Sequence, residues 1–142
     1  MTHKGSCFCG AVEIAVSGDP VDMGYCHCQS CRSYSGAPFV AFTIWPSDNV
    51  AVTKGAELIG GYNKVGTSDR KYCTQCGGHM FIDHPKLGVV DVRAAILPTV
   101  DFEPKAHLSY AEAVFAVSDD LPKFVDFPAE IGGSGKLVDA AD

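Results

Sequence analysis

Seven cysteines constrain this chain more than any other feature of its 142-residue sequence. They stand in three short clusters: Cys7-x-Cys9, Cys26-x-Cys28-x-x-Cys31 and Cys73-x-x-Cys76. A framework made only of disulfides would leave one of seven thiols over. Two thiolates two or three residues apart can reach one metal ion without strain, and zinc takes four ligands in tetrahedral geometry. The spacing therefore predicts zinc binding rather than disulfide pairing.

The ligand count favours one group of four thiolates and one group of three. The middle cluster supplies three ligands by itself, so it can cap one face of an ion and leave a fourth position open. The two outer pairs then make a closed site, the usual arrangement of structural zinc, whereas an open position is usual in catalytic sites. The predicted sets are a closed site of Cys7, Cys9, Cys73 and Cys76 and an open site of Cys26, Cys28 and Cys31. One four-cysteine site with spare thiols is the alternative that this arithmetic leaves open.

The composition predicts one small, mainly β domain. The chain is 46% hydrophobic with 15 Gly and 8 Pro, so turn residues are dense and long helices are not expected. Short alternating or β-branched runs predict strands at residues 11–16, 38–44, 50–53, 57–63, 70–73, 80–83, 89–95 and 107–113. The segments 50–53 and 57–63 are predicted to form a hairpin around Lys54-Gly55-Ala56. The cysteine-rich stretch 25–36 is expected to be a loop with a short helical turn.

Charge and hydropathy exclude several classes of partner. The formal net charge is −6 and no basic run occurs, which disfavours a nucleic-acid or anionic-membrane partner. No window reaches the roughly 18 apolar residues of a membrane span. The first eight residues lack the apolar core of a secretory signal. We therefore expect a cytoplasmic protein, whose thiols stay reduced.

Four segments resemble the glutathione-dependent formaldehyde-activating enzyme family, whose domain is shared with centromere protein V. They are GSCFCGAV (5–12), CHCQSCRSYSGAPF (26–39), RKYCTQCGGHMF (70–81) and DDLPKF (119–124). The resemblance covers nearly the whole chain and places all seven cysteines on the family's metal positions. It implies a zinc-anchored domain of the β-tent kind over residues 1–130. The glycine-rich segment 131–142 lies outside the resemblance and is predicted to be a flexible C-terminal tail.

The same resemblance implies an activity. A structural zinc would lie on the four-cysteine set and a catalytic zinc on the three-cysteine set. The family reaction joins glutathione to formaldehyde to give S-hydroxymethylglutathione, a carbon–sulfur lyase reaction in its reverse sense that serves aldehyde detoxification. The expected partners are a small thiol and a small aldehyde. No glutathione-binding residue and no oligomeric state can be carried over.

A few other residues invite a functional interpretation beside a structural one. His27 stands between two ligands, but its side chain should point away from theirs, which favours a structural role. Arg32 could attract a substrate carboxylate or form a surface ion pair. His79 follows the second cysteine turn, where four thiolates already suffice for one ion. Trp45 is expected to pack in the core, and neither His84 nor His107 carries a spacing signal.

Three functions are compatible with two zinc sites. The first is an enzyme that adds a thiol to an aldehyde at the open site, since zinc favours the deprotonated form of a coordinating thiol. The second is a binding module in which the metals only stabilise the fold. The third is a zinc or redox sensor whose open site releases its metal on oxidation. The open position favours the enzyme; a protein side chain filling it would favour the binding module.

Overall fold

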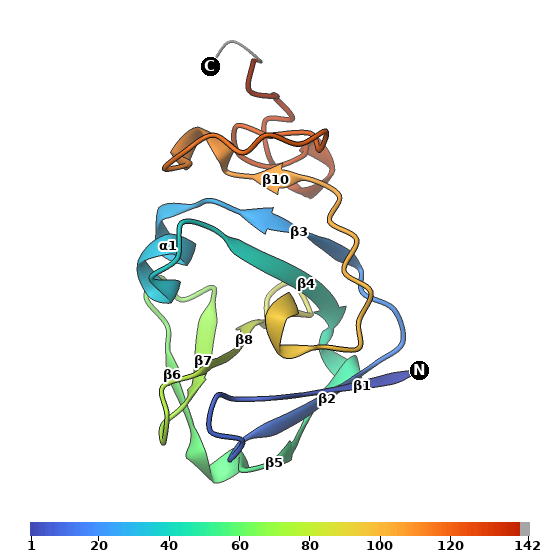
Figure 1. Ribbon diagram of the computed structural model, residues 1–142, viewed down its shortest axis with the longest axis vertical. Helices are drawn as coiled ribbons and strands as arrows, with labels where there is room; N and C mark the ends of the chain where they lie inside the picture. The colour runs from blue at the N-terminus through green and yellow to red at the C-terminus, as the bar shows by residue number, and fades with distance from the viewer. Residues whose placement is uncertain (140–142) are drawn as a thin grey trace. The chain divides into compact units, whose positions relative to one another are not determined.

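The structure is a computed structural model that describes residues 1–139 (Figure 1). The chain divides into two compact units, which are described separately. Unit 1 comprises Met1–Asp22 and Thr43–Phe102, and unit 2 comprises Met23–Phe42 and Glu103–Asp142. Because strand β4 (Val40–Pro46) crosses the boundary at Thr43, its two halves belong to different units.

Unit 1 contains two sets of strands. The antiparallel sheet β1-β2-β5 is made of Thr2–Ser6, Glu13–Ser17 and Val50–Lys54. The second set has the order β4-β9-β8-β7-β6. The other members are β6 (Ile59–Tyr62), β7 (Asp69–Cys73), β8 (His79–His84) and β9 (Val89–Arg93). Short 3₁₀ turns lie at Ser47–Asn49 (η1), Ala56–Leu58 (η2) and Ala94–Ile96 (η3).

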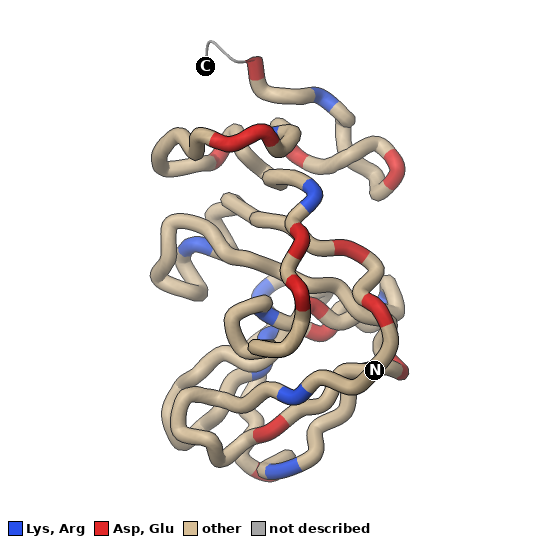
Figure 2. Tube along the Cα trace, turned by 45° about the vertical axis from the view of Figure 1, so that its right-hand side comes forward, with Lys and Arg blue, Asp and Glu red and all other residues tan. Residues whose placement is uncertain are grey.

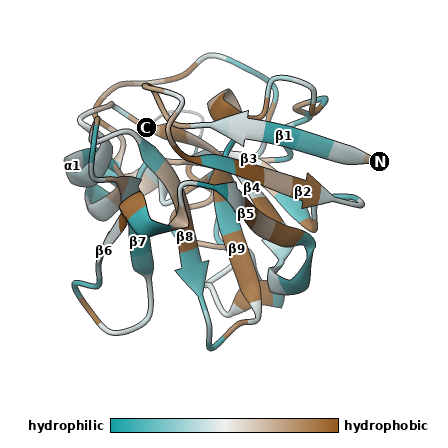
Figure 3. Cartoon of the chain, turned by 90° about the horizontal axis from the view of Figure 1, so that it is seen from below, coloured by the Kyte–Doolittle hydropathy of each residue, from teal (hydrophilic) through white to brown (hydrophobic). Residues whose placement is uncertain are grey.

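The hydrophobic core of unit 1 draws on both sets of strands. Hydrophobic residues lie along β2 and β9 in Figure 3, and Ile14 and Val92 are fully buried. The alternating burial of β2 places Ile14 and Val16 on one face, as a period of two requires. Two of the predicted zinc ligands, Cys7 and Cys73, belong to this same cluster. The predicted core position of Trp45 is confirmed, since its side chain is 0% exposed.

A buried hydroxyl completes the polar contacts of that core. Thr43 Oγ1 donates to the Val92 carbonyl at 2.6 Å and accepts from Trp45 Nε1 at 2.7 Å. Thr43→Val removes the acceptor and leaves the buried indole N–H unpaired, so we expect a loss of about 1–3 kcal/mol in the free energy of unfolding. Urea denaturation measures it, with Thr53→Val on the exposed side of β5 as the matched control. Equal unfolding midpoints for the two variants would contradict this assignment.

Unit 2 contains the only α-helix among residues 1–139, α1 (Gln29–Ser35), together with strands β3 (Asp22–Cys26) and β10 (His107–Leu108). The strand order is β10-β3-β4, with β10 parallel to β3. Two 3₁₀ turns follow, at Tyr110–Glu112 (η4) and Ala129–Ile131 (η5). Residue 107 also forms a parallel bridge with Lys123, so the chain after β10 folds back against that strand.

The predicted mainly β class with few short helical turns is confirmed, and the strands form open sheets. Strands β1 and β3 were not predicted from the sequence. In β1 the buried positions are occupied by His3 and Gly5, so no apolar alternation marks the strand. In β3 glycine occupies a buried position, Gly24, where a Cβ would lie 2.7 Å from the Ala106 carbonyl oxygen.

The predicted hairpin around Lys54-Gly55-Ala56 is wrong. Strand β5 pairs with β2, whereas β6 pairs with β7, so the two strands enter different sheets. Gly55 has φ +74°, and a Cβ there would lie 2.2 Å from the Ala11 carbonyl oxygen. The glycine and the η2 turn redirect the chain between the sheets instead of closing a hairpin.

The segment predicted as a flexible tail, 131–142, is hydrogen-bonded in its described part. Val125 N–H donates to the Lys136 carbonyl at 2.8 Å, and Val138 N–H donates to the Lys123 carbonyl at 2.8 Å. Residues 140–142 of the predicted tail lie outside the described residues. The domain boundary at residue 130 stays a prediction.

Basic residues are spread singly along the trace in Figure 2, with Arg70 and Lys71 the one adjacent pair in the sequence. Within residues 1–139, no helix is both long and apolar enough to span a membrane.

Candidate metal centres

Four sulfur atoms from distant parts of unit 1 come together. The Sγ atoms of the four cysteines all lie within 4.8 Å of one another: Cys7, Cys9, Cys73 and Cys76. Cys7 Sγ lies 3.6 Å from Cys9 Sγ, and Cys9 Sγ lies 3.9 Å from Cys73 Sγ. Four sulfurs about 2.3 Å from a tetrahedral zinc would be about 3.8 Å apart. The spacing of this group, here called the tetrad, therefore fits one zinc ion.

Tight turns present the sulfurs of the tetrad. Between Cys73 and Gly78 the chain turns so that Gly77 N–H donates to the Cys73 carbonyl at 2.7 Å. Gly77 has φ +75°, which a side chain would strain. Gly78 N–H then donates to Cys76 Sγ at 3.3 Å, and Val12 N–H donates to Cys7 Sγ at the same distance. These amides stabilise negative charge on sulfur.

The thiols of the tetrad do not ionise alike. Burial opposes ionisation of Cys7, but the Val12 N–H and the neighbouring thiols outweigh it and lower its pKa to about 6. For Cys9 the Ala11 backbone favours the thiolate, but burial and the neighbouring thiols outweigh it and raise the pKa to about 11. Thiolates this close to one another repel electrostatically. A divalent cation would supply the positive charge that lets all four ionise.

Three further sulfurs come together in unit 2. The Sγ atoms of Cys26, Cys28 and Cys31, here called the trio, also lie within 4.8 Å of one another. Cys26 ends β3, Cys28 is the N-cap of α1, and Cys31 lies on the helix. Cys31 N–H donates to Cys28 Sγ at 3.3 Å. The end of β3 and the first turn of α1 thus bring the three sulfurs together.

The trio is incomplete as a closed metal site. No fourth His, Cys, Asp or Glu donor of residues 1–139 joins this group. Cys26 and Cys31 are buried, whereas Cys28 is only partly buried. Hydrogen bonds with Cys28 and Cys31, and then burial, raise the pKa of Cys26. Cys26 therefore favours the neutral thiol, and a bound cation would be needed to stabilise its thiolate.

The structure gathers the two groups of sulfurs that the spacing favoured, and all seven cysteines are free thiols. Zinc as the ion, and the structural and catalytic roles of the tetrad and the trio, stay predictions. His79 joins neither group; it lies on β8 opposite Tyr72. Burial and then the charges of Arg93 and Arg70 lower the pKa of His79.

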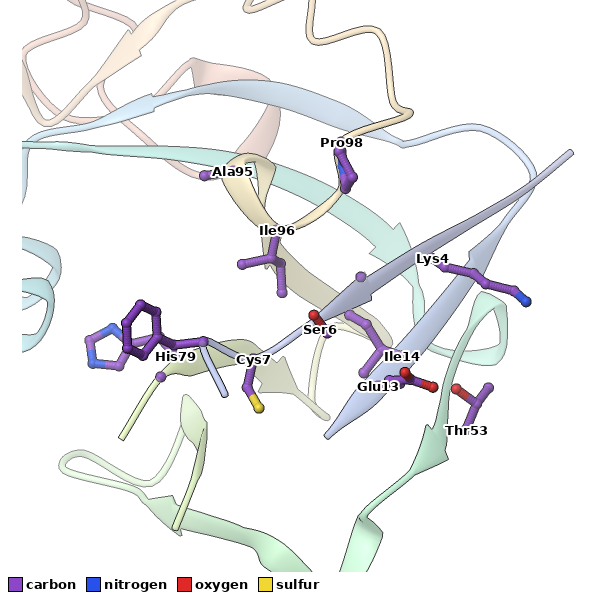
Figure 4. Close-up of a pocket in the computed structure, with 13 residues that line it drawn as sticks. Lys4, Ser6, Cys7, Glu13, Ile14, Thr53, His79, Ala95, Ile96 and Pro98 are labelled. Carbon is purple, nitrogen blue, oxygen red and sulfur yellow. The ribbon is translucent and has the colours of Figure 1, made fainter. Parts of the chain in front are cut away.

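A hollow of about 840 Å³ opens in unit 1 beside the tetrad (Figure 4). Cys7 and His79 lie at one end of it, and Lys4, Glu13 and Thr53 at the other. Its lining contains no residue of the trio. The hollow therefore adjoins the closed group of four sulfurs, not the open group of three.

Arg32 makes a hydrogen bond that neither sequence-based interpretation included. Arg32 Nε donates to the His27 carbonyl at 3.0 Å, so the guanidinium braces the trio's own loop. His27 is 1% exposed and its ring points to His107, which agrees with the favoured structural role. Burial, then the charges of His107 and Arg32, lower the pKa of His27 to about 4.

Sequence reasoning missed His107, Asp119 and Lys123. His107 is 0% exposed and hydrogen-bonds to both His27 and Asp119. The only available signal was the segment 119–124, which is one of the four segments that carry the family resemblance. Nothing in the spacing of His107 marked it, because its partners lie 80 residues before it and 12 residues after it.

Comparison with known proteins identifies a matching family and several relatives. Residues 2–112 match the family model described as glutathione-dependent formaldehyde-activating enzyme. A lyase of Schizosaccharomyces pombe, named as uncharacterised, is 27% identical over 79 residues, which are 56% of this chain and 56% of that protein. A Penicillium rubens protein named for glutathione-dependent formaldehyde activation is 32% identical over 92 residues, 61% of this chain and 48% of that protein.

The chain thus spans about half the length of these curated relatives. A crystal structure of a Rhodobacter sphaeroides protein superposes with a TM-score of 0.55 and 31% sequence identity. The match covers 69% of this chain and 90% of that one.

Proposed function

Because the chain belongs to the glutathione-dependent formaldehyde-activating enzyme family, we propose that it adds a small thiol to a small aldehyde at the trio. Glutathione is the thiol and formaldehyde the aldehyde that the family's name indicates. In the reaction the thiol sulfur bonds to the carbonyl carbon, and the carbonyl oxygen takes up a proton. The product is S-hydroxymethylglutathione, so the enzyme is a carbon–sulfur lyase acting in reverse.

The incomplete ligand set at the trio carries this proposal. Cys26, Cys28 and Cys31 would hold zinc with one position open, whereas the tetrad would hold a second zinc closed to substrate. Zinc at the trio would supply a Lewis acid that favours the thiolate form of an incoming thiol. Of the three ligands, Cys28 is the one that is only partly buried.

The chain's own contribution is to hold the trio in place. Cys28 Sγ accepts from Cys31 N–H, and Ser35 Oγ donates to the Cys31 carbonyl at 2.6 Å. Arg32 Nε holds the His27 carbonyl, which lies between the first two ligands. The terminal nitrogens of Arg32 are then the atoms that could bind a glutathione carboxylate. Holding the thiol beside the aldehyde replaces a bimolecular encounter with a positioned one. The proposed setting is the cytoplasm, where thiols stay reduced.

Cobalt substitution tests the proposal directly. Glutathione titrated into the dicobalt protein is expected to change the thiolate-to-cobalt charge-transfer bands, because a soft site with an open position binds sulfur. Binding should release about one proton per thiol bound, since the bound form is the thiolate. Proton release is measured in weak buffer, and formation of S-hydroxymethylglutathione from ¹³C-formaldehyde is measured by exchange NMR.

Two ligands serve as controls. A tripeptide analogue of glutathione with a methyl group in place of the thiol should leave the bands unchanged. A small unrelated thiol that changes them as strongly as glutathione would indicate a general thiol site. If neither thiol changes the spectrum of a protein with metal at the trio, the binding-module function is favoured instead.

A further inference from the structure

Three side chains of unit 2 form a hydrogen-bonded line that starts between two trio ligands. His27 Nε2 lies 2.8 Å from His107 Nδ1, and His107 Nε2 lies 2.7 Å from Asp119 Oδ2. The two rings are 1% and 0% exposed. This line of His27, His107 and Asp119 is called the imidazole chain below. It connects the trio's loop to the segment 119–124, to which the proposed function gives no role.

The outer end of the imidazole chain is fixed by a lysine. Lys123 Nζ donates to Asp119 Oδ1 at 2.7 Å and to the Asp119 and Leu121 carbonyls. Burial opposes ionisation of Asp119, but the hydrogen bonds from Lys123 and His107 outweigh it and lower its pKa to about 2. Asp119 is therefore an ionised carboxylate that can only accept hydrogen bonds.

An acceptor at one end sets the order of protons along the imidazole chain. His107 Nε2 must carry a proton in order to donate to Asp119. With both rings neutral, His107 Nδ1 is then an acceptor and His27 Nε2 is the donor to it. A carboxylate hydrogen-bonded to a histidine can fix both the tautomer and the orientation of the imidazole ring, as in catalytic triads.

Packing and backbone contacts hold His27 on its other sides. Its ring stacks on Phe39 at 4.8 Å between centroids and meets Tyr110 edge-on at 4.9 Å. Its N–H donates to the Leu108 carbonyl at 3.0 Å, and its carbonyl accepts from Arg32 Nε at 3.0 Å. The residue between the first two ligands is thus held by its ring, its N–H and its carbonyl.

We propose that Asp119 and Lys123 are positioning residues that preset the trio for its metal through His107 and His27. Since Cys26 and Cys28 flank His27, the direction of the His27 ring fixes the backbone from which both sulfurs project. The inference rests on the proposed function only in taking the trio as a metal site. Outer partners that orient a metal site typically change its affinity by 10–100-fold.

Metal affinity at each site tests the inference without an activity assay. Metal-free protein is titrated with Co²⁺ under anaerobic conditions, zinc affinities follow from chelator competition, and the Cys31→Ser protein identifies the step that belongs to the trio. Asp119→Asn is nearly isosteric but can also donate, so it no longer enforces one proton order. We expect the trio to bind metal about tenfold more weakly in this variant, with the tetrad unchanged.

Two further readouts separate positioning from general stability. Imidazole ¹⁵N shifts of His27 and His107 should report one tautomer in the parent protein and mixed tautomers in Asp119→Asn. Lys123→Met keeps the carboxylate and should give a smaller loss at the trio, which covers the case in which Asp119→Asn fails to fold. Asp126→Asn is the matched control, because Asp126 binds Ser134 and Phe127 and has no hydrogen bond to the imidazole chain.

The outcomes are distinguishable. Selective weakening of the trio in Asp119→Asn or Lys123→Met, absent in Asp126→Asn, supports the inference. The inference is overturned if both variants bind metal at the trio as tightly as the parent protein does. It is also overturned if the metal affinities of the trio and the tetrad fall equally. If the parent protein binds cobalt at the trio but does not bind glutathione, the proposed function is contradicted. The comparison of metal affinities between variants would still decide this inference.

Discussion

Cys73→Ser is expected to unfold unit 1. Structural zinc contributes on the order of 10 kcal/mol in small zinc-binding peptides, which is comparable to the whole stability of a domain. Cys73 lies in the hydrophobic core at 0% exposure, and its sulfur contacts that of Cys9, 64 residues away in the chain. The substitution therefore removes a metal ligand and a link between distant segments together.

Circular dichroism and zinc content measure the effect. Removal of zinc from the parent protein with a strong chelator should produce the same loss of structure. Val92→Thr is the matched control, because it places a hydroxyl at another fully buried position of the same core without touching a sulfur. It should remain folded at a cost of about 1–3 kcal/mol. A Cys73→Ser protein that melts like the parent and keeps its zinc would exclude a structural role for the tetrad.

Cys31→Ser is expected to separate stability from activity. The trio lies within one short stretch and closes no long loop, so loss of its metal should change the free energy of unfolding little. We expect a folded protein with about one zinc fewer and a loss of aldehyde-dependent turnover on the order of a hundredfold or more, since a Lewis acid supplies several kcal/mol. Metal analysis, thermal melting and the NMR assay check the three parts.

Ser33→Ala, on the exposed side of the same helix, is the control for Cys31→Ser. It should keep both metals and full turnover. If Cys31→Ser unfolds as completely as Cys73→Ser, the assignment of a structural tetrad and a catalytic trio is wrong. If it retains turnover, the reaction takes place elsewhere in the protein.

The grouping of the cysteines was predictable because members of each cluster lie close together in sequence. Cys26, Cys28 and Cys31 are separated by one and two residues, and the end of β3 followed by the first turn of α1 brings their sulfurs together. The turn from Cys73 to Gly78 was predictable for the same reason, since Gly77 provides the positive φ and the amide of Gly78 points at sulfur. Alternation of apolar residues likewise predicted strands such as β2, where one face is buried.

The strand partners were decided by tertiary structure. The stretches that became β5 and β6 are adjacent in sequence and have strand-like composition, so a hairpin was the simplest prediction. Their pairing depends on Gly55 lying against the Ala11 backbone, a contact between residues 44 positions apart that no local pattern records.

The imidazole chain shows the same limit within the site itself. The sequence by itself determined that His27 stands between two ligands and should point away from them. Only the fold placed His107 and Asp119 beyond it, because β10 pairs in parallel with β3 and aligns His107 with Tyr25. Spacing within a few residues fixes local geometry, whereas hydrogen bonds between distant side chains depend on which surfaces the folded chain buries together, and that is set by packing throughout a unit rather than by any one segment.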